Sequence, residues 1–533
     1  MRWRSTSGAL DTSNNPGSPK RRVRGALESI LPSGRFSEER TILAGTGQNA
    51  VGLVAAMLAA FATQVLITRA LGSAAFGVVT VATQLAFVGG AATRFGMDMA
   101  AVRRVAIDLG RGERARVRAV VARAAVVAGA VSLAAGAVVF GASDWLARAF
   151  TTAPGDGRSA FRAAAVALPF VALAQVYLGA TRGLKVMRHT LYIYWLGQPA
   201  AWIALMVLGW VWARTVGVSV LAYAGSWIVA TAAAVWVWRR LTAGFGGLPP
   251  EPGETGDLLR YGAPRAPAAL FSQLLFWTDL FVLAHFASSS EVGVYAAAVR
   301  AAQVILLFLI SVNYVFSPFV ADLYARRQRD RLDALFKSLT RWMLAATLPI
   351  FIVFAVAPGT VLRLFGEGFG AGRGALLILM AGQLINVATG SVGFILIMVG
   401  RTAIDLAVNA GAVALSVATA AMLVPRYGME GAAVAGALTL AVSNLCRLAL
   451  VWRYLRIQPF TREYLRLAVP VIAGAVAALL AHRVAGGGSW QVDLGSTALA
   501  GTLAYGAALV AAGLPSRERV AALRLLSLIR RGN

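Results

Sequence analysis

Three arginines lie inside long apolar segments of the 533-residue sequence, where a charged side chain needs a specific reason to be present. They are Arg69, Arg265 and Arg300. A charge at the centre of a membrane-spanning helix costs at least about 2.5–3.5 kcal/mol on insertion scales. Guanidinium groups can hold the oxygens of a phosphate group bidentately. These residues therefore predict a cationic cavity for an anionic ligand.

The three arginines differ in depth along their helices. Arg300 lies about 13 Å into its span by helical rise, close to the middle of a bilayer. Arg265 lies about 10 Å into its span, and the flanking prolines Pro264 and Pro267 break the helix and free carbonyl groups there. Arg69 lies near the other end of its span, and snorkelling or capping of a turn explains it better than ligand binding.

One carboxylate in the same segments offers the arginines a structural alternative. Asp279 follows Arg265 by fourteen residues, so a helix places both on one side. An ion pair of Asp279 with Arg265 or Arg300 is the alternative to a ligand cavity. We assign Asp279 to holding an arginine or to gating, because an unpaired carboxylate would repel an anionic ligand. Polar residues of these spans could contact sugar hydroxyls, although interhelical hydrogen bonding is their commoner use; they are Gln64, Gln273, Gln303 and Asn313.

The composition indicates that these segments cross a membrane. Hydrophobic residues make up 58% of the chain and charged residues only 14%, with a formal net charge of +27. A single cysteine, Cys446, and three scattered histidines exclude a disulfide framework and a Cys/His zinc site, so no metal or cofactor is expected. A helix needs about 20 apolar residues to cross a bilayer. Counting such stretches predicts an all-α polytopic membrane protein of about fourteen helices.

The basic residues are distributed as the positive-inside rule requires. The connections richest in arginine, Arg103–Arg123 and Arg326–Arg341, are expected in the cytoplasm, as are both termini. The sequence therefore predicts a multi-pass protein of the cytoplasmic membrane. The basic tails 1–40 and 515–533 are expected to lie against anionic membrane lipids. Nucleic acid is not expected as a partner, because no aromatic-studded basic groove accompanies the charge.

An internal repeat organises the predicted helices. The segment Leu66–Val79 resembles Val282–Tyr295, which follows 216 residues later. Six spans separate equivalent helices, so the two copies have the same polarity and are related by an axis along the membrane normal. Two such bundles around a shared site are typical of a transporter that works by alternating access. The expected parts are a basic disordered cytoplasmic tail (1–40), an N-lobe of six helices (41–240), a cytoplasmic linker (241–257), a C-lobe of six helices (258–455), two extra C-terminal helices (456–514) and a basic amphipathic cytoplasmic tail (515–533).

Short phrases at equivalent turns resemble a known family. They are Ile67–Gly72 followed by Phe76 and Gly77, and Trp277–Asp279 followed by Val292–Ala298. Over roughly residues 41–455 the sequence resembles the polysaccharide-biosynthesis and O-antigen-type lipid-linked oligosaccharide flippases of the MOP superfamily, which is related to the MATE transporters. The resemblance implies two six-helix lobes around a central cavity. It also implies export of a polyprenyl-diphosphate-linked glycan, with glycosyltransferases or a polymerase of the same pathway as partners.

Other functions fit the sequence less well. No lysine follows a glycine, so the chain lacks a Walker A phosphate loop for ATP hydrolysis. A membrane glycosyltransferase or polymerase would need catalytic carboxylates on a large outer loop, and the longest such connection offers only Asp144 and Asp156. We therefore expect no enzyme activity. A cation or drug antiporter of the same superfamily and a lipid-linked peptidoglycan-precursor flippase are the remaining alternatives.

Overall fold

Helices form all the regular structure of the residues that the computed structural model describes, which are 37–248, 253–263 and 265–513. Side chains are described from residue 57 onward, except for 307, 311, 314, 315, 317 and 318. The predicted tail 515–533 and residues 1–36 of the predicted tail 1–40 lie outside the described residues. The first helices are α2 (Ser37–Thr93), α3 (Met97–Gly110), α4 (Arg114–Gly141), α5 (Ser143–Phe150), α6 (Pro154–Gly183), the π-helix η1 (Thr190–Gly197), α7 (Gln198–Trp210) and α8 (Val216–Leu241).

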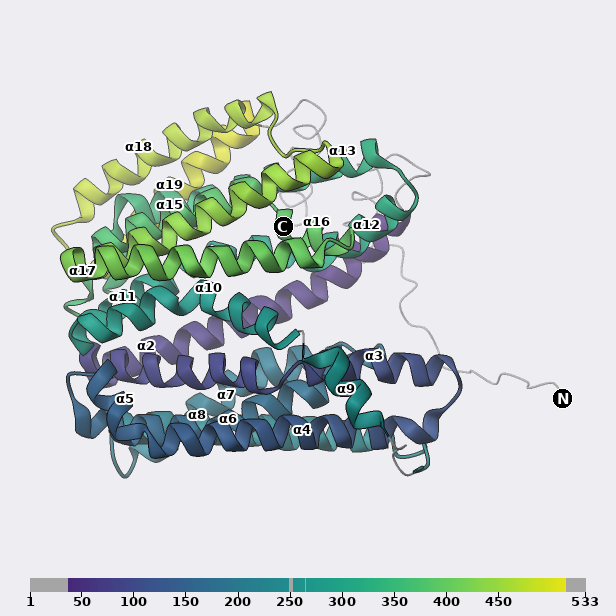
Figure 1. Ribbon diagram of the computed structural model, residues 1–533. Coiled ribbons are helices and arrows are strands. Elements are labelled where there is room, and N and C mark those ends of the chain that lie inside the picture. The colour runs from purple at the N-terminus through teal and green to yellow at the C-terminus, as the bar shows by residue number, and fades with distance from the viewer. Residues whose placement is uncertain (1–36, 249–252, 264, 514–533) are drawn as a thin grey trace, which may run out of the picture.

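A second group of helices follows the linker and lies above the first group in Figure 1. The first half of α2 runs between the two groups. The short helix α9 lies against α3, beside the first group. The remaining elements are α9 (Glu254–Gly262), α10 (Arg265–Phe286), α11 (Ser289–Gln303), α12 (Leu306–Ala325), α13 (Arg329–Val356), α14 (Pro358–Leu362), the 3-10 helix η2 (Phe369–Gly372), α15 (Arg373–Thr389), α16 (Val392–Met398), α17 (Thr402–Leu455), the 3-10 helix η3 (Arg462–Leu467), α18 (Ala468–Ala485), α19 (Trp490–Ala508) and the π-helix η4 (Leu509–Gly513).

Two of the helices are interrupted by a glycine in the left-handed region of backbone conformation. In α2 this residue is Gly72 (φ 80°), and in α17 it is Gly428 (φ 53°). Glycine adopts a positive φ without the steric penalty that a Cβ would add. Each long helix is therefore two helices joined at a kink. We call the side of the molecule that holds these two glycines the kink end, and the opposite side, with the 242–253 connection, the linker end.

The predicted all-α, multi-pass membrane architecture is confirmed. Within the described part of the chain, eleven helices are long and apolar enough to cross a membrane. The count is consistent with the fourteen predicted spans once α2 and α17 are each divided at their kink. The one predicted span that remains, 292–319, corresponds to α11 and α12 together. Burial of apolar side chains and backbone hydrogen bonding within each helix explain why only helices occur in such a chain.

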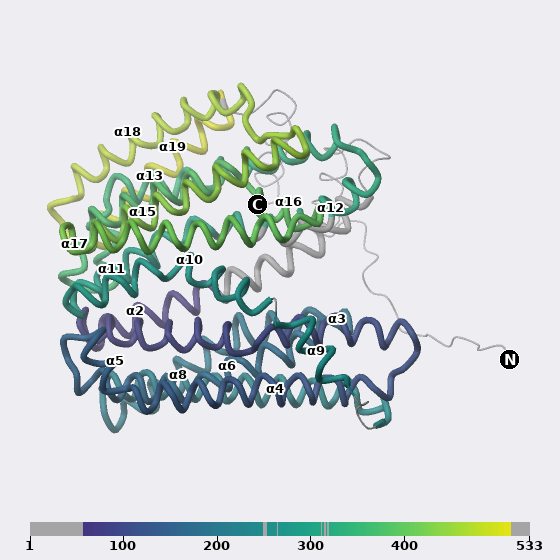
Figure 2. Tube along the Cα trace, in the orientation of Figure 1, coloured from purple at the N-terminus to yellow at the C-terminus, as the bar shows by residue number. Residues whose placement is uncertain are grey.

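The two groups of helices meet at the kink end in a nearly symmetric contact. A Cβ on Gly77 would overlap the carbonyl oxygen of Ser289, and a Cβ on Gly293 would overlap the carbonyl oxygen of Ser73. Ser73 and Gly77 are the residues 216 positions before Ser289 and Gly293. Each repeat therefore presents the same serine and glycine to the other. Small residues allow this close approach of α2 and α11, which lie side by side in Figure 2.

Candidate functional site

A cavity of about 200 Å³ lies between the two groups of helices, away from the kink-end contact. Its walls come from α2 and α6, from the π-helix η1, and from α10 of the second group. Movement of one group of helices against the other would therefore change the access of a ligand to this cavity. The lining residues are Phe87, Ala91, Arg94, Val171, Gln175, Arg182, Thr190, Tyr194, Trp195 and Gln273.

Two guanidinium groups give this cavity positive charge. Arg94 lies in the turn between α2 and α3, and Arg182 lies in the last turn of α6. The Nε of Arg94 is 3.5 Å from a carboxylate oxygen of Asp98, a buried residue of α3. This contact holds the Arg94 side chain at the wall of the cavity. The site can accept an anionic group and offer it several charged donors.

The π-helix η1 supplies the aromatic part of the wall. π-Helical turns are rare and are frequently found at functional sites. Tyr194 and Trp195 meet edge to face with ring centroids 5.0 Å apart, and Tyr194 also lies 5.8 Å from the ring of Trp227 on α8. The side-chain amides of Gln175 and Gln273 add hydrogen-bond donors and acceptors. The cavity thus combines cationic, aromatic and amide groups, a combination that suits a phosphorylated sugar.

Arg300 lies deeper between the two groups. Its guanidinium carbon is 4.8 Å from the ring centroid of Trp277, and Nη1 donates a 3.4 Å hydrogen bond to Oε1 of Gln303. Its Nε is buried and finds no hydrogen-bond partner within the described part of the chain. Trp277 follows Gln273 by one helical turn, so the two share a face of α10. Arg300 therefore lies behind the wall of the cavity, with Trp277 in contact and Gln273 one turn away.

Asp279 is held by neutral groups. The hydroxyl of Tyr295 donates to it at 2.5 Å, and the backbone N–H of Leu280 donates at 2.8 Å. It also packs against Gly436 of α17. Among the described residues no arginine pairs with it, so the ion pair expected for Asp279 is not formed. An ion pair with Asp279 therefore does not explain Arg300. The contacts of its guanidinium described above are with an aromatic ring and a side-chain amide.

The other two predicted arginines lie at opposite ends of the molecule. Arg265 is exposed at the linker end, where its guanidinium lies 4.8 Å from the ring centroid of Tyr261. Arg69 lies at the kink end. It donates to the carbonyl oxygens of Leu364 at 2.9 Å and Arg363 at 3.2 Å. The structure therefore does not bring Arg69, Arg265 and Arg300 into one cavity, and Arg69 caps a turn of the opposite group.

The predicted polar residues also lie in different parts of the molecule. Gln273 lines the cavity, and Gln303 accepts from Arg300. Gln64 and Asn313 are both buried and are not among the residues that line it. The Oδ1 of Asn313 has no hydrogen-bond partner within the described residues. Only Gln273 of the predicted residues therefore contacts the cavity directly.

The cationic and aromatic residues of the cavity were not predicted from the sequence. Arg94 and Arg182 lie at the ends of predicted spans, where basic residues are ordinary. Tyr194 and Trp195 lie in an aromatic-rich segment that fits an interfacial belt equally well. Only Arg182 carried a signal in the sequence. With the residue after it, Arg182 aligns with Val399–Gly400, 217 residues later, and so belongs to the internal repeat.

Two models of known protein families match parts of the chain. A family model described as "Polysaccharide biosynthesis protein" matches residues 42–324. A second model, "MatE", matches residues 264–422. Together they cover the chain from residue 42 to residue 422, within α17, and the first covers every residue that lines the cavity.

Individual relatives are distant. Two proteins of Haloferax volcanii match: the "Probable low-salt glycan biosynthesis flippase Agl15", 21% identical over 190 residues, and the "Probable flippase AglR", 24% identical over 262 residues. These matches span 36% and 47% of this chain, and only 40% and 53% of the relatives' own lengths.

Two solved structures share the fold at low identity. One is "Lipid II flippase MurJ, inward closed conformation", with a TM-score of 0.70, 12% identity and coverage of 86% of this chain and 97% of that chain. The other is an inward-facing multidrug resistance MATE family transporter of the MOP superfamily, with a TM-score of 0.63, 14% identity and coverage of 76% and 98%. The chain therefore shares the fold of these two structures.

Proposed function

The chain belongs to the polysaccharide biosynthesis protein family, and from that membership we propose that it is a flippase. Its proposed substrate is a polyprenyl-diphosphate-linked oligosaccharide, a precursor of a surface polysaccharide. Movement of the two groups of helices would expose the cavity first to one side of the cytoplasmic membrane and then to the other. The names of the two Haloferax relatives, both flippases and one of them in glycan biosynthesis, agree with this proposal.

The observation that carries the proposal is the composition of the cavity wall. Arg94 and Arg182 line the cavity together with Tyr194 and Trp195, so two guanidinium groups would bind the diphosphate beside two aromatic rings. An anion held by guanidinium groups inside the membrane avoids much of the cost of crossing it unpaired. The polyprenyl chain needs no protein site, because it can stay in the lipid.

The closed kink end gives the proposed direction of access. Hydrogen bonds join the two groups there: Ser73 and Ser290 share one between hydroxyls at 2.6 Å, and the backbone N–H of Thr152 donates to Ser289 Oγ at 3.0 Å. The arginine-rich connections around α3 and α4 lie at the linker end. By the positive-inside rule the linker end is the cytoplasmic side. We therefore assign the closed kink end to the outer face.

The partners proposed for the chain follow from the substrate. Glycosyltransferases of the same pathway would supply the lipid-linked glycan on the cytoplasmic side, and a polymerase or ligase would consume it outside. The basic terminal tails would lie on anionic lipids of the inner leaflet.

A vesicle assay tests the proposed function. The purified protein is reconstituted with a fluorescent short-chain polyprenyl-diphosphate oligosaccharide, and its outward movement is followed by quenching with a membrane-impermeant reagent. We expect protein-dependent movement of the diphosphate-linked glycan and none of a neutral glycolipid with the same sugars. Equal movement of the two lipids, or movement of neither while a cationic drug is transported, would overturn the proposal.

A further inference from the structure

A second pocket, of about 390 Å³, lies at the linker end between α3 and α9. Its size is within the range of small-ligand sites. It is separate from the cavity between the lobes and shares no lining residue with it. Its walls are polar apart from Ala100 and Leu258, and the other lining residues are Arg103, Arg104, Glu254, Asp257, Arg260 and Tyr261.

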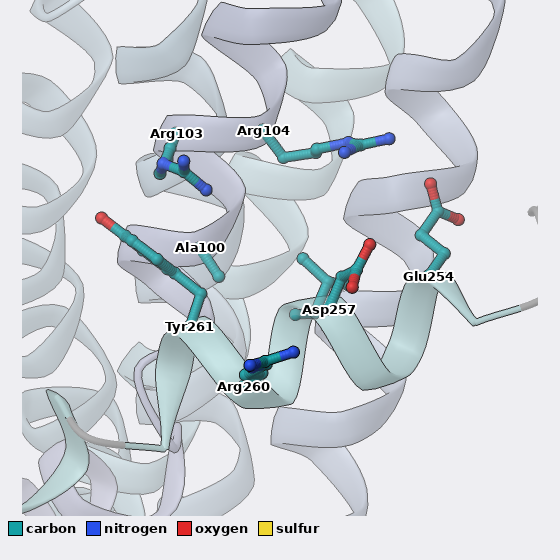
Figure 3. Close-up of a pocket in the computed structure, with 8 residues that line it drawn as sticks. Ala100, Arg103, Arg104, Glu254, Asp257, Arg260 and Tyr261 are labelled. Carbon is teal, nitrogen blue, oxygen red and sulfur yellow. The ribbon is translucent and has the colours of Figure 1, made fainter.

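Charges of opposite sign face this pocket from different sides. Figure 3 shows Arg103 above the ring of Tyr261 on one side and Asp257 with Glu254 on the other. The guanidinium carbon of Arg103 lies 4.7 Å from the centroid of the Tyr261 ring. Arg260 lies below the pocket in the same view. Arg104 lies above the pocket, on the side of Glu254, so charges of both signs surround the hollow.

Three of these charged side chains have no charged partner within the described part of the chain. Among the described residues, Arg103, Arg260 and Asp257 form neither an ion pair nor a side-chain hydrogen bond, although all three line the same pocket. Arg104 differs, because its Nε is 3.2 Å from the buried carboxylate of Asp108. Opposite charges on flexible surface side chains usually pair or point apart. Here they surround a space that a ligand could fill.

The depth of the pocket places it among lipid headgroups. Arg103 follows Ser73, at the kink end, by thirty residues of nearly continuous helix. That length corresponds to about 45 Å at 1.5 Å per residue. A bilayer is about 40–45 Å thick including both headgroup regions. With the kink end at one face, the pocket lies at the headgroup level of the other.

We propose that this pocket binds the headgroup of a zwitterionic phospholipid that carries a phosphate and a primary ammonium group, the phosphatidylethanolamine class. Arg103 and Arg260 bind the phosphate, which guanidinium groups hold through charge-assisted hydrogen bonds. Asp257 binds the ammonium group. A purely anionic headgroup would leave the carboxylate of Asp257 facing its negative charge. The proposal needs only that the chain spans a membrane, and it stands apart from the transport activity.

Lipid binding to the full-length protein tests this assignment. Native mass spectrometry in detergent compares phosphatidylethanolamine with phosphatidylglycerol of the same acyl chains. We expect the ethanolamine lipid to bind about tenfold more tightly, the size of one charge-assisted hydrogen bond. Asp257→Asn should abolish that preference. Arg103→Gln and Arg260→Gln should weaken binding of both lipids, whereas Arg118→Gln, an exposed arginine outside the pocket, should change nothing.

Competition with soluble compounds separates the chemistry from simple anion binding. Phosphoethanolamine should displace the bound lipid at lower concentration than inorganic phosphate does. The proposal is overturned if phosphatidylglycerol binds the wild-type protein as tightly as phosphatidylethanolamine, or if Asp257→Asn keeps the preference. It is also overturned if inorganic phosphate competes as well as phosphoethanolamine, since the carboxylate of Asp257 would then contribute nothing.

Discussion

Two arginines within the helices have contrasting surroundings. Arg447 of α17 is buried, with its Nε 2.9 Å from Asp405 and its Nη2 2.5 Å from Oδ1 of Asn409. Arg300 contacts only Trp277 and Gln303 among the interactions described above. A fully paired buried arginine stabilises the fold because its removal strands a carboxylate. An arginine without a carboxylate keeps its charge available to a ligand.

Removal of Arg300 should therefore affect transport and not folding. We expect Arg300→Ala to reduce vesicle transport about 10-fold, because the positive charge behind the cavity wall attracts the anionic substrate through a medium of low dielectric constant, while expression and thermal stability stay close to wild type. Arg300→Lys should retain part of the activity. Arg447→Ala is the contrasting variant and should lower the yield of folded protein, because a broken buried ion pair costs about 3–5 kcal/mol. Normal transport by Arg300→Ala would show that the residue is dispensable.

Asp108 gives a prediction for the pH dependence of stability. Burial raises the pKa of Asp108 above its ordinary value, and Arg104 offsets this in part. A carboxyl group with a raised folded-state pKa favours folding when protonated, and this contribution is lost as pH rises through that pKa. Asp108→Asn should therefore raise Tm at pH 7, with the gain shrinking toward pH 4. A Tm series in detergent checks this, and a lower Tm for the variant at pH 7 would contradict it.

Residue types and depth predicted part of the site. The depth argument found Arg300 and Gln273, because a charge or amide at mid-bilayer needs a special explanation. It could not find Arg94 or Arg182, because position near a helix end makes a basic residue unremarkable in sequence. It kept Arg69 as a candidate while favouring snorkelling or a turn cap for it, and Arg69 does bind carbonyl groups at the kink end. Those assignments depend on which helix ends face each other, and that is a property of the packing.

At the scale of elements, the contact of α2 with α11 decides whether the kink end is closed. The serine and glycine of each repeat pack against those of the other, with no room for a Cβ on Gly77 or Gly293. His285 adds a contact to the carbonyl oxygen of Ala149 at 3.0 Å. His285 is the repeat equivalent of Arg69, so each repeat directs one polar side chain to a carbonyl of the other.

A disulfide across this contact should stop transport. Ser73 Oγ and Ser290 Oγ are 2.6 Å apart, so cysteines there are close enough for a bond of about 2.05 Å. We expect oxidised Ser73→Cys/Ser290→Cys protein to lose at least about nine-tenths of its vesicle transport, the fraction that a closed outer gate would block, and to regain it on reduction. The exposed Cys446 is first replaced by serine. The single-cysteine variants serve as controls, and full transport by cross-linked protein would mean that this contact need not open.

Element types were predictable, but their local irregularities were not. Long apolar stretches between charged turns predicted the helices, since a bilayer permits little else. The π-helix η1, which places Tyr194 and Trp195 at the cavity, follows from tertiary packing and leaves no pattern in Thr190–Gly197. The kink at Gly72 falls in the predicted turn between the first two spans.

At the scale of the whole molecule, most of what could be predicted about the arrangement of the helices came from the internal repeat. Its offset of 216 residues predicted two lobes of equal polarity, and the same offset relates the contact of Ser73 with Gly293 to that of Ser289 with Gly77. The positions of the lobes relative to each other could not be predicted, because the sequence is the same in the open and closed states.

The membrane potential should influence transport if the substrate crosses as an anion. An inside-negative potential favours outward movement by about 2.3 kcal/mol per uncompensated charge per 100 mV. We expect vesicles clamped at zero potential to transport more slowly than polarised vesicles. An unchanged rate would mean that the charge is compensated during crossing or that consumption of the product provides the direction.

The most direct test concerns the two arginines of the cavity. Transport of the diphosphate-linked oligosaccharide is measured in vesicles for Arg94→Gln/Arg182→Gln and for the matched control Arg118→Gln, with equal amounts of folded protein. The account predicts at least about a 100-fold loss for the double variant, as for two lost charge-assisted hydrogen bonds, and wild-type rates for the control. Wild-type transport by the double variant would contradict passage of the diphosphate through this cavity.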